Sequence, residues 1–168
     1  MTSSDRKNWI RAEANRLGFS FTGFTTADPL EAETLRYLDW LRRGCHGEMV
    51  YLERADTIAK RADPRALFPD GRSAIVFGVR IGVWPRPDRG YQVADFARYY
   101  DYHDTIPVRL NELFERYNRV FASELRWKIC ADSSPVFERA LAVRAGLGWI
   151  GRRSEEHTSE LQSHQPIS

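Results

Sequence analysis

Apolar residues recur at helical spacing in three stretches of the chain, over residues 10–17, 35–41 and 106–125. A glycine comes soon after each of the first two stretches, as expected where a helix ends. The third stretch is the clearest amphipathic pattern, and it tolerates Pro107 in its expected first turn. The pattern therefore predicts three helices, each with one apolar face.

Segments with the composition of strands lie between these helices. Residues 19–27 alternate aromatic with small or hydroxyl residues, and residues 73–83 form a continuous apolar run typical of a buried central strand. Residues 127–131 have the pattern of a further short strand. Strands that alternate with helices predict an α/β fold, an α+β sandwich whose central sheet is mixed, partly parallel and flanked by helices.

A fourth helix is expected after Asp132. Ser133 or Ser134 is a candidate N-cap, Pro135 falls near the first helical position, and Gly146 follows the expected end. From Gly146 the chain reads GLGWIG, which has the glycine spacing of a dinucleotide-binding turn. That motif needs a strand before it and a helix after it, whereas here a helix comes first. We therefore interpret GLGWIG as a helix end followed by a tight turn.

The composition is that of one ordinary globular domain. The chain has 168 residues, 42% of them hydrophobic and 29% charged. It contains neither an apolar run long enough to span a membrane nor an N-terminal signal segment, so a cytoplasmic protein is expected. Cys45 and Cys130 are isolated, which favours two free thiols over a disulfide. The net charge of +2 is too small to indicate nucleic-acid binding by itself.

The end of the sequence differs in character from the rest. From Arg153 it reads RSEEHTSELQSHQPIS, with one leucine and no apolar period. A disordered native tail is one explanation. We favour another, because RSEEHTSELQSH matches the translation of a common short-read sequencing adapter codon by codon. Residues 153–168 are then an artefactual disordered tail, and without them the net charge changes from +2 to +4, since Arg153 and three glutamates are removed.

Asp132 is the most informative polar residue. It is expected where a strand ends and a helix begins, which is the position at which open α/β sheets bind ligands. The alternative is a structural N-cap, a role that the neighbouring serines can also fill. As a general acid, this carboxyl group would need an environment that raises its pKa toward neutrality.

Several segments resemble the epoxyqueuosine reductase family. The chain reads ADSSPVFERALAVRAGLGWIGR over 131–152, WLRRGCHGEMVYLER over 40–54 and R-x-D-P-x-x-L-x-P over 61–69. The stretch ARYYDYHDTIP over 97–107 also resembles a family segment, with a shortened spacing after Tyr99. These similarities follow the family order over residues 10–152.

The resemblance implies a cobalamin-dependent, iron–sulfur-containing oxidoreductase that reduces epoxyqueuosine to queuosine in the anticodon loop of tRNA. Residues 1–152 would be its N-terminal cobalamin-binding domain, incomplete at the C-terminal end. The cysteine runs that hold the two 4Fe–4S clusters of such enzymes are absent from this sequence, so the fragment alone is expected to be inactive. A cytoplasmic monomer that acts on tRNA and does not contact a membrane is also implied.

The resemblance also assigns site residues. Asp132 matches the aspartate that donates a proton during epoxide opening, and Arg54, Arg98, Tyr99 and Arg139 match positions that line the cobalamin pocket. His103 is not assigned as a cobalt ligand, because the family holds cobalamin without a protein histidine. His46 is interpreted as a turn residue.

Two alternatives remain open from the sequence. One is a cobalamin-dependent relative with another substrate, of the reductive dehalogenase-like kind, and the other is a small α/β binding domain without enzymatic activity. Basic residues on the first predicted helix favour tRNA as the partner, and these are Arg6, Lys7, Arg11 and Arg16.

Overall fold

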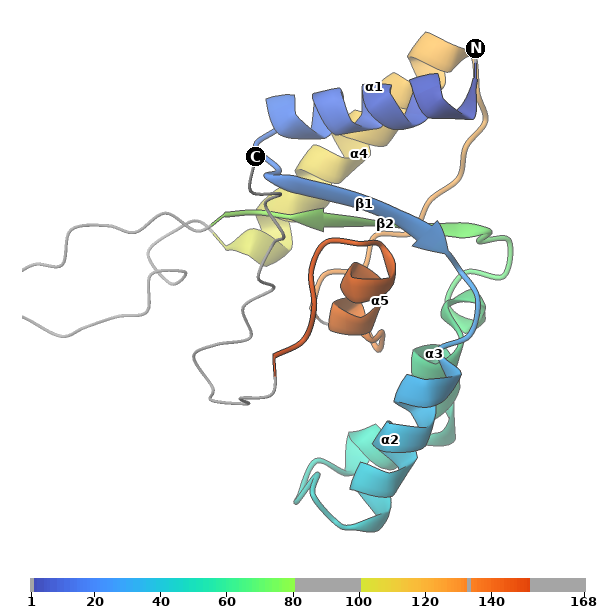
Figure 1. The fold of residues 1–168 in the computed structure, drawn as a ribbon, viewed down its shortest axis with the longest axis vertical. Helices are drawn as coiled ribbons and strands as arrows, with labels where there is room; N and C mark the ends of the chain where they lie inside the picture. The colour runs from blue at the N-terminus through green and yellow to red at the C-terminus, as the bar shows by residue number, and fades with distance from the viewer. Residues whose placement is uncertain (1, 81–100, 133, 152–168) are drawn as a thin grey trace, which may run out of the picture. The chain divides into compact units, whose positions relative to one another are not determined.

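The computed structural model describes residues 2–80, 101–132 and 134–151 (Figure 1). The chain divides into two compact units, which we describe separately. The first unit is Met1–Thr22 with Phe77–Ala131, and the second unit is Gly23–Val76 with Asp132–Ser168. The elements in chain order are α1 (Ser3–Arg16), β1 (Phe21–Thr26), α2 (Glu31–Arg42), η1 (Val50–Glu53), α3 (Ala55–Ala62), η2 (Pro64–Ala66), β2 (Ser73–Gly78), α4 (Tyr102–Phe121) and α5 (Glu138–Arg144).

Helix α1 begins with a reciprocal cap. The hydroxyl of Thr2 accepts from the Asp5 N–H at 3.2 Å, and the Asp5 carboxylate accepts from the Thr2 N–H at 2.8 Å. The helix ends before Gly18, whose φ of +88° is readily reached only by glycine. The helix predicted around residues 10–17 is therefore confirmed.

Helix α4 is confirmed as well, but it begins at Tyr102 rather than at residue 106. Asp101 caps it by accepting the His103 N–H at 2.8 Å, so Pro107 lies inside the helix and not in its first turn. The helix ends at Ala122, which has a left-handed φ of 45°. No helix of the described residues is long and apolar enough to cross a lipid bilayer.

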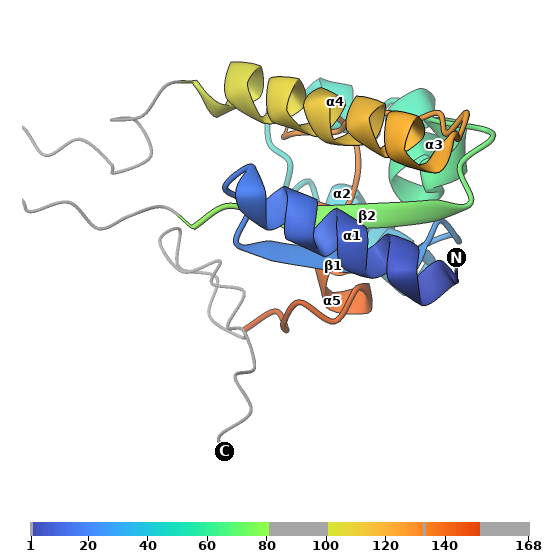
Figure 2. The same ribbon diagram turned by 90° about the horizontal axis from the view of Figure 1, so that it is seen from above.

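In the first unit α1 and α4 pack side by side and run antiparallel, as Figure 2 shows. The ring of Trp9 meets the rings of Tyr117 and Phe121 edge-on, at centroid distances of 5.8 and 5.5 Å. Leu113 is fully buried between the helices. The apolar stripe read from the sequence is thus the face of α4 that forms the core of this unit.

The strands β1 and β2 form a two-stranded antiparallel sheet. The Ser20 N–H donates to the Gly78 carbonyl at 2.7 Å, and the Ala27 N–H donates to the Arg72 carbonyl at 3.2 Å, so the partners run in opposite directions. The α/β class is confirmed, whereas the part of the sheet that the structure describes has no parallel pair. Both strands are crossed by the boundary between the two units.

The strand predicted over residues 127–131 is wrong, because these residues have no regular structure. A side chain anchors the segment instead. The Trp127 ring stacks on Phe114 at 5.4 Å, and its indole N–H donates to the Asn111 Oδ1 at 2.8 Å. The apolar pattern therefore reflects attachment to α4 rather than membership of the sheet.

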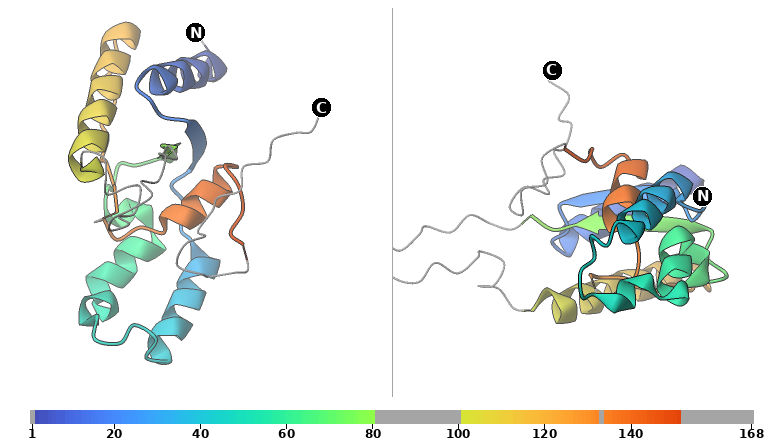
Figure 3. Two further views of the ribbon diagram at one scale, coloured as in Figure 1. Left: turned by 90° about the vertical axis from the view of Figure 1, so that its left-hand side faces the viewer. Right: turned by 90° about the horizontal axis from the view of Figure 1, so that it is seen from below.

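In the second unit α2 and α3 lie side by side (Figure 3). The Leu30 N–H donates to the Ala62 carbonyl at 2.8 Å and joins the start of α2 to the end of α3. A small core forms around Leu30, Ala140 and Leu141, with partly buried residues from β2 against it. The apolar face predicted for α2 is only partly used, since Leu35 is 69% exposed.

Candidate functional site

Asp132 lies in an irregular segment six residues before α5, and its side chain is exposed. Its φ is +55°, in the left-handed region that residues other than glycine rarely adopt. The Asp132 backbone N–H donates to the Glu138 Oε1 at 2.9 Å. No residue spacing indicated Glu138 for this role.

The start predicted for α5 is wrong, because the helix begins at Glu138 rather than next to Pro135. The Val136 N–H donates to the Ser134 carbonyl at 2.8 Å, so a tight turn replaces the expected first turn of helix. Ser133, the other candidate N-cap, lies outside the described residues. The early serine and proline therefore shape the turn that carries Asp132 toward α5.

The end of α5 confirms the interpretation of GLGWIG. The Gly146 N–H donates to the Val143 carbonyl at 2.9 Å, and the Leu147 N–H donates to the Ala142 carbonyl at 3.0 Å. With a φ of +76° at Gly146, these two bonds form a Schellman motif. Gly146 thus ends the helix, and GLGWIG begins at the end of a helix rather than between a strand and a helix.

Arg144 joins α5 to the end of β1 and to the segment that follows it. Its guanidinium donates to the carbonyls of Thr26 and Asp28 at 2.7 and 2.9 Å, and to the Thr25 hydroxyl at 3.1 Å. Gly23 approaches the end of the same helix so closely that a Cβ there would lie 2.8 Å from the Ala145 Cβ. Polar and backbone contacts therefore fix the position of α5.

The start of α5 is held by rings. Phe137, which precedes the helix, meets the Tyr37 ring edge-on at 5.5 Å, and the Arg61 guanidinium lies 5.3 Å from the Tyr37 ring and 5.7 Å from the Phe137 ring. The Tyr37 hydroxyl donates to the Leu52 carbonyl at 2.9 Å. Burial raises the pKa of Tyr37, and the charge of Arg61 opposes that shift only in part.

The residues predicted to bind a cofactor are distributed over several elements. Arg139 is the second residue of α5 and is exposed, like Asp132. Arg54 is exposed at the N-cap position of α3. Arg98 and Tyr99 lie outside the described residues. The structure therefore brings Asp132 and Arg139 to one helix start and places Arg54 on a different helix.

The two histidines discussed above have protein partners. The His103 Nδ1 lies 2.8 Å from the Asp101 Oδ1, and backbone and side-chain hydrogen bonds from His103 lower the pKa of Asp101. The buried His46 pairs through Nε2 with Glu53 and lies in a turn after α2. Both arrangements are those of structural residues at a helix start and in a turn.

The basic residues of α1 are only partly available to a ligand. Arg16 pairs with Glu13 at 2.8 Å and with Glu112 at 2.6 Å, and the Arg6 guanidinium lies over the Phe121 ring at 5.8 Å. These contacts join α1 to α4 within the first unit. The basic side of α1 therefore contributes to packing, which weakens it as an argument for tRNA binding.

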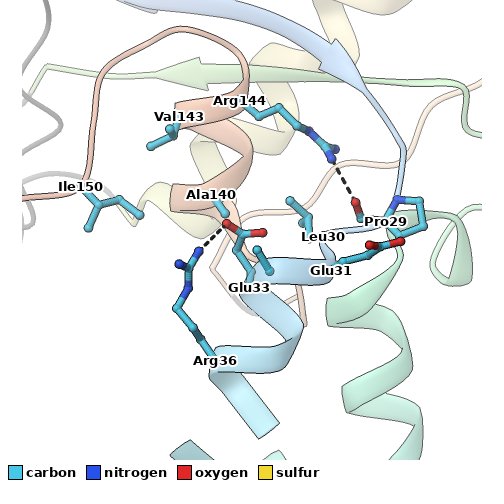
Figure 4. A pocket seen from close by; sticks show the side chains of 10 residues that line it. Pro29, Leu30, Glu31, Glu33, Arg36, Ala140, Val143, Arg144 and Ile150 are labelled. Atoms are coloured by element: carbon cyan, nitrogen blue, oxygen red, sulfur yellow. Dashed lines mark hydrogen bonds and ion pairs between the residues drawn. The ribbon is translucent and has the colours of Figure 1, made fainter. Parts of the chain in front are cut away.

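A pocket of about 510 Å³ lies in the second unit between the start of α2 and α5 (Figure 4). Its apolar lining includes Leu30, Ala140, Val143 and Ile150. On its wall, Arg36 pairs with Glu33 at 2.9 Å, and Arg144 donates to the Pro29 carbonyl at 3.3 Å. Both arginines are thus engaged, and none of the described residues predicted to bind a cofactor lines this pocket.

Comparison with known proteins identifies relatives for most of the chain. Residues 61–133, which include Asp132, match the family described as epoxyqueuosine reductase QueG, DUF1730. An epoxyqueuosine reductase of Cellulophaga algicola is 35% identical over 165 residues, an alignment that covers 96% of this chain and 52% of the relative. Over this length the chain is similar to epoxyqueuosine reductases. It spans about half the length of the curated relatives it matches.

Solved epoxyqueuosine reductases share the fold. A crystal structure of a selenomethionine-labelled epoxyqueuosine reductase matches with a TM-score of 0.69 and 28% identity, over 89% of this chain and 40% of that one. Another epoxyqueuosine reductase, solved with an epoxyqueuosine-modified tRNA-Tyr stem loop, matches with a TM-score of 0.66 and 25% identity, with the same coverage. These matches favour the resemblance to epoxyqueuosine reductases over the two alternatives left open by the sequence.

The donor set of the chain can be compared with the cofactors that an epoxyqueuosine reductase implies. Two 4Fe–4S clusters need four thiolates each, and the chain has two cysteines, so it does not fit the clusters. Among the described residues no group of three or more His, Cys, Asp or Glu could hold a metal ion. The exposed guanidinium groups of Arg54 and Arg139 do fit a ligand such as cobalamin, which presents amides and a phosphate.

Proposed function

We propose that this chain forms the proton-donating, cobalamin-binding part of an enzyme that reduces epoxyqueuosine to queuosine in tRNA. The observation that carries the proposal is the exposed Asp132, whose backbone is left-handed and whose N–H is held by Glu138 at the start of α5. Opening an epoxide leaves a negative charge on oxygen, and a positioned carboxylic acid neutralises that charge by proton transfer. The similarity to proteins named epoxyqueuosine reductase supports this substrate.

Arg54 and Arg139, together with Arg98 and Tyr99, are proposed to hold the cobalamin. Guanidinium groups donate several hydrogen bonds in a fixed plane, which suits the amide oxygens and the phosphate of this ligand. When bound there, cobalamin would supply the reducing chemistry that the epoxide requires. The chain itself orients the ligand and provides the proton at Asp132.

The electron source lies outside the residues of this chain. The overall reduction consumes two electrons and two protons and releases the epoxide oxygen as water, and the two 4Fe–4S clusters are proposed to deliver the electrons from a part of the enzyme that these residues do not cover. We propose tRNA as the partner, the cytoplasm as the compartment and a monomer as the active form. The solved relative with a bound tRNA stem loop supports the choice of partner.

Substitution at Asp132 tests the proposal in a full-length epoxyqueuosine reductase, at the position that matches this residue. Asparagine tolerates the left-handed conformation and keeps the side-chain shape, but it cannot donate the proton in the same way. We expect Asp132→Asn to lower kcat by ~100-fold or more, while the visible spectrum of bound cobalamin stays unchanged. Full turnover by this variant would remove Asp132 from the mechanism.

We also propose that residues 153–168 are translated adapter and not part of the enzyme. Their composition, which lacks any apolar period, supports this proposal. The test is a genomic read past the codon for Arg152. Native codons for asparagine, apolar residues and then two four-cysteine runs would agree with it, whereas a genomic RSEEHTSELQS would overturn it.

A further inference from the structure

The conformation of Asp132 needs an explanation within the chain. Its φ of +55° is unfavourable for a residue with a Cβ, so an isolated segment would spend most of its time in other conformations. Something must therefore stabilise the left-handed backbone. The Asp132 N–H donates to the Glu138 carboxylate at 2.9 Å, a charge-assisted bond that reaches back over six residues.

Glu138 has a fixed position from which to act. It is the first residue of α5, directly after Phe137, whose ring is enclosed by Tyr37 and Arg61. The Leu141 N–H donates to the Phe137 carbonyl at 3.0 Å and continues the helix from that point. The backbone of Glu138 is thus restrained from both sides, and its carboxylate can transmit this restraint to Asp132.

We propose that Glu138 is a positioning residue for the proton donor. By holding the Asp132 N–H, it fixes the backbone from which the acid side chain extends, and so the direction in which the proton is delivered. This inference rests on the proposed function of Asp132. The alternative is that Glu138 only stabilises α5, as acidic side chains in the first turn of a helix generally do. That effect depends on the charge of Glu138 and not on its bond to Asp132.

Three substitutions in a full-length, cofactor-loaded reductase separate these roles, at the position that matches Glu138. Glu138→Gln keeps an acceptor oxygen at the same reach but removes the charge. Glu138→Asp keeps the charge but shortens the reach, and Glu138→Leu removes the acceptor. Positioning predicts that Gln retains kcat within ~3-fold and that Asp and Leu lower kcat by ~10- to 100-fold at unchanged KM. A helix-dipole role predicts the opposite order for Gln and Asp.

Hydrogen exchange at single amides gives a second readout that does not depend on turnover. In Glu138→Asp and Glu138→Leu, the amide of Asp132 is expected to exchange at least ~10-fold faster. The amide of Leu141 inside α5 should keep its exchange rate. Unchanged exchange at Asp132 in both variants would overturn the proposal, as would unchanged kcat. If Glu138→Leu does not fold, the comparison of Glu138→Asp with Glu138→Gln still distinguishes positioning from a helix-dipole role.

The exchange measurement also separates this inference from the proposed function. Full turnover by Asp132→Asn, with the amide of residue 132 still protected by Glu138, would reject Asp132 as the proton donor and leave the bond intact. Loss of turnover in Asp132→Asn combined with no effect of any Glu138 substitution would keep the donor and reject Glu138 as its positioning residue.

Discussion

The two units hold their helices in different ways. In the first unit, α1 and α4 are held by rings and by Leu113, which has no exposed surface. In the second unit, α5 is seven residues long and depends on Arg144, which donates to carbonyl groups after β1, and on the close approach of Gly23. Apolar burial dominates the first arrangement, whereas the second adds directional polar contacts at the end of α5 to ring contacts at its start and a small apolar core.

This difference explains where the proposed chemistry lies. Apolar packing is not directional, so it allows small rotations of a helix. Hydrogen bonds to backbone atoms are directional and therefore restrict such rotations. Asp132 precedes α5 by six residues and is joined to the first residue of that helix by the hydrogen bond from its N–H to Glu138. Single substitutions can remove the apolar and the polar contacts separately.

The largest effect is expected in the first unit. Leu113→Ala should lower the free energy of unfolding by ~2–5 kcal/mol, since it leaves a cavity in a core with no room to adjust. Leu35→Ala is the matched control, because Leu35 is 69% exposed, and it should change stability by less than ~0.5 kcal/mol. Urea unfolding measures both. Equal effects would show that α4 is not the stability core of its unit.

Arg144→Met should lower stability by ~2–3 kcal/mol, because it leaves carbonyl groups after β1 without their charged donor. Arg36→Met is the control, since Arg36 is an exposed arginine near the same pocket and its ion pair with Glu33 contributes less than ~0.5 kcal/mol (Figure 4). Thermal unfolding compares the two variants. A loss confined to Arg36→Met would contradict the role given to Arg144.

A smaller effect is expected from added volume at α5. Gly23→Ala should cost ~1–3 kcal/mol, because the new Cβ would lie 2.8 Å from Ala145 and Leu147. Gly146→Ala meets no atom within 4 Å and should cost only ~1 kcal/mol, through its φ of +76°. Denaturant midpoints decide the order. If both variants were equally stable, the close approach at Gly23 would have no energetic weight.

The smallest effect concerns acid. Burial would raise the pKa of Glu13, but hydrogen bonds and charges from Arg16 and Arg116 outweigh it and hold this pKa below its usual value of 4.5. A lowered folded-state pKa stabilises the protein above the unfolded pKa, and that contribution disappears as the pH falls through the folded value. Stability should therefore fall as the pH drops from the unfolded-state pKa of Glu13 through its lower folded-state pKa.

The control for the acid effect is Glu13→Gln. This variant should be less stable at neutral pH and should show a flatter pH dependence between pH 5 and ~3, measured by urea unfolding at each pH. An unchanged acid slope would mean that other carboxyl groups carry the pH dependence of the first unit.

The sequence predicted those parts of the fold that have a periodic apolar pattern or a local helix-end signal. The apolar period of α4 identified its buried face, and the glycine at 146 identified the end of α5. It did not predict the start of α5 or the contacts made by Glu138 and Arg144, because a bond from one side chain to a distant backbone atom leaves no period in the sequence. Asp132 was singled out by its expected place between a strand and a helix, and the resemblance then assigned it the role of proton donor. Its backbone conformation could not be read from any pattern.

Ala122 is a position at which the stability of the fold can be increased. Its left-handed φ of 45° at the end of α4 is one that glycine would adopt with less strain. Replacing Ala122 with glycine would relieve this strain and raise the stability of the fold. The added stability could compensate for destabilising substitutions near Asp132.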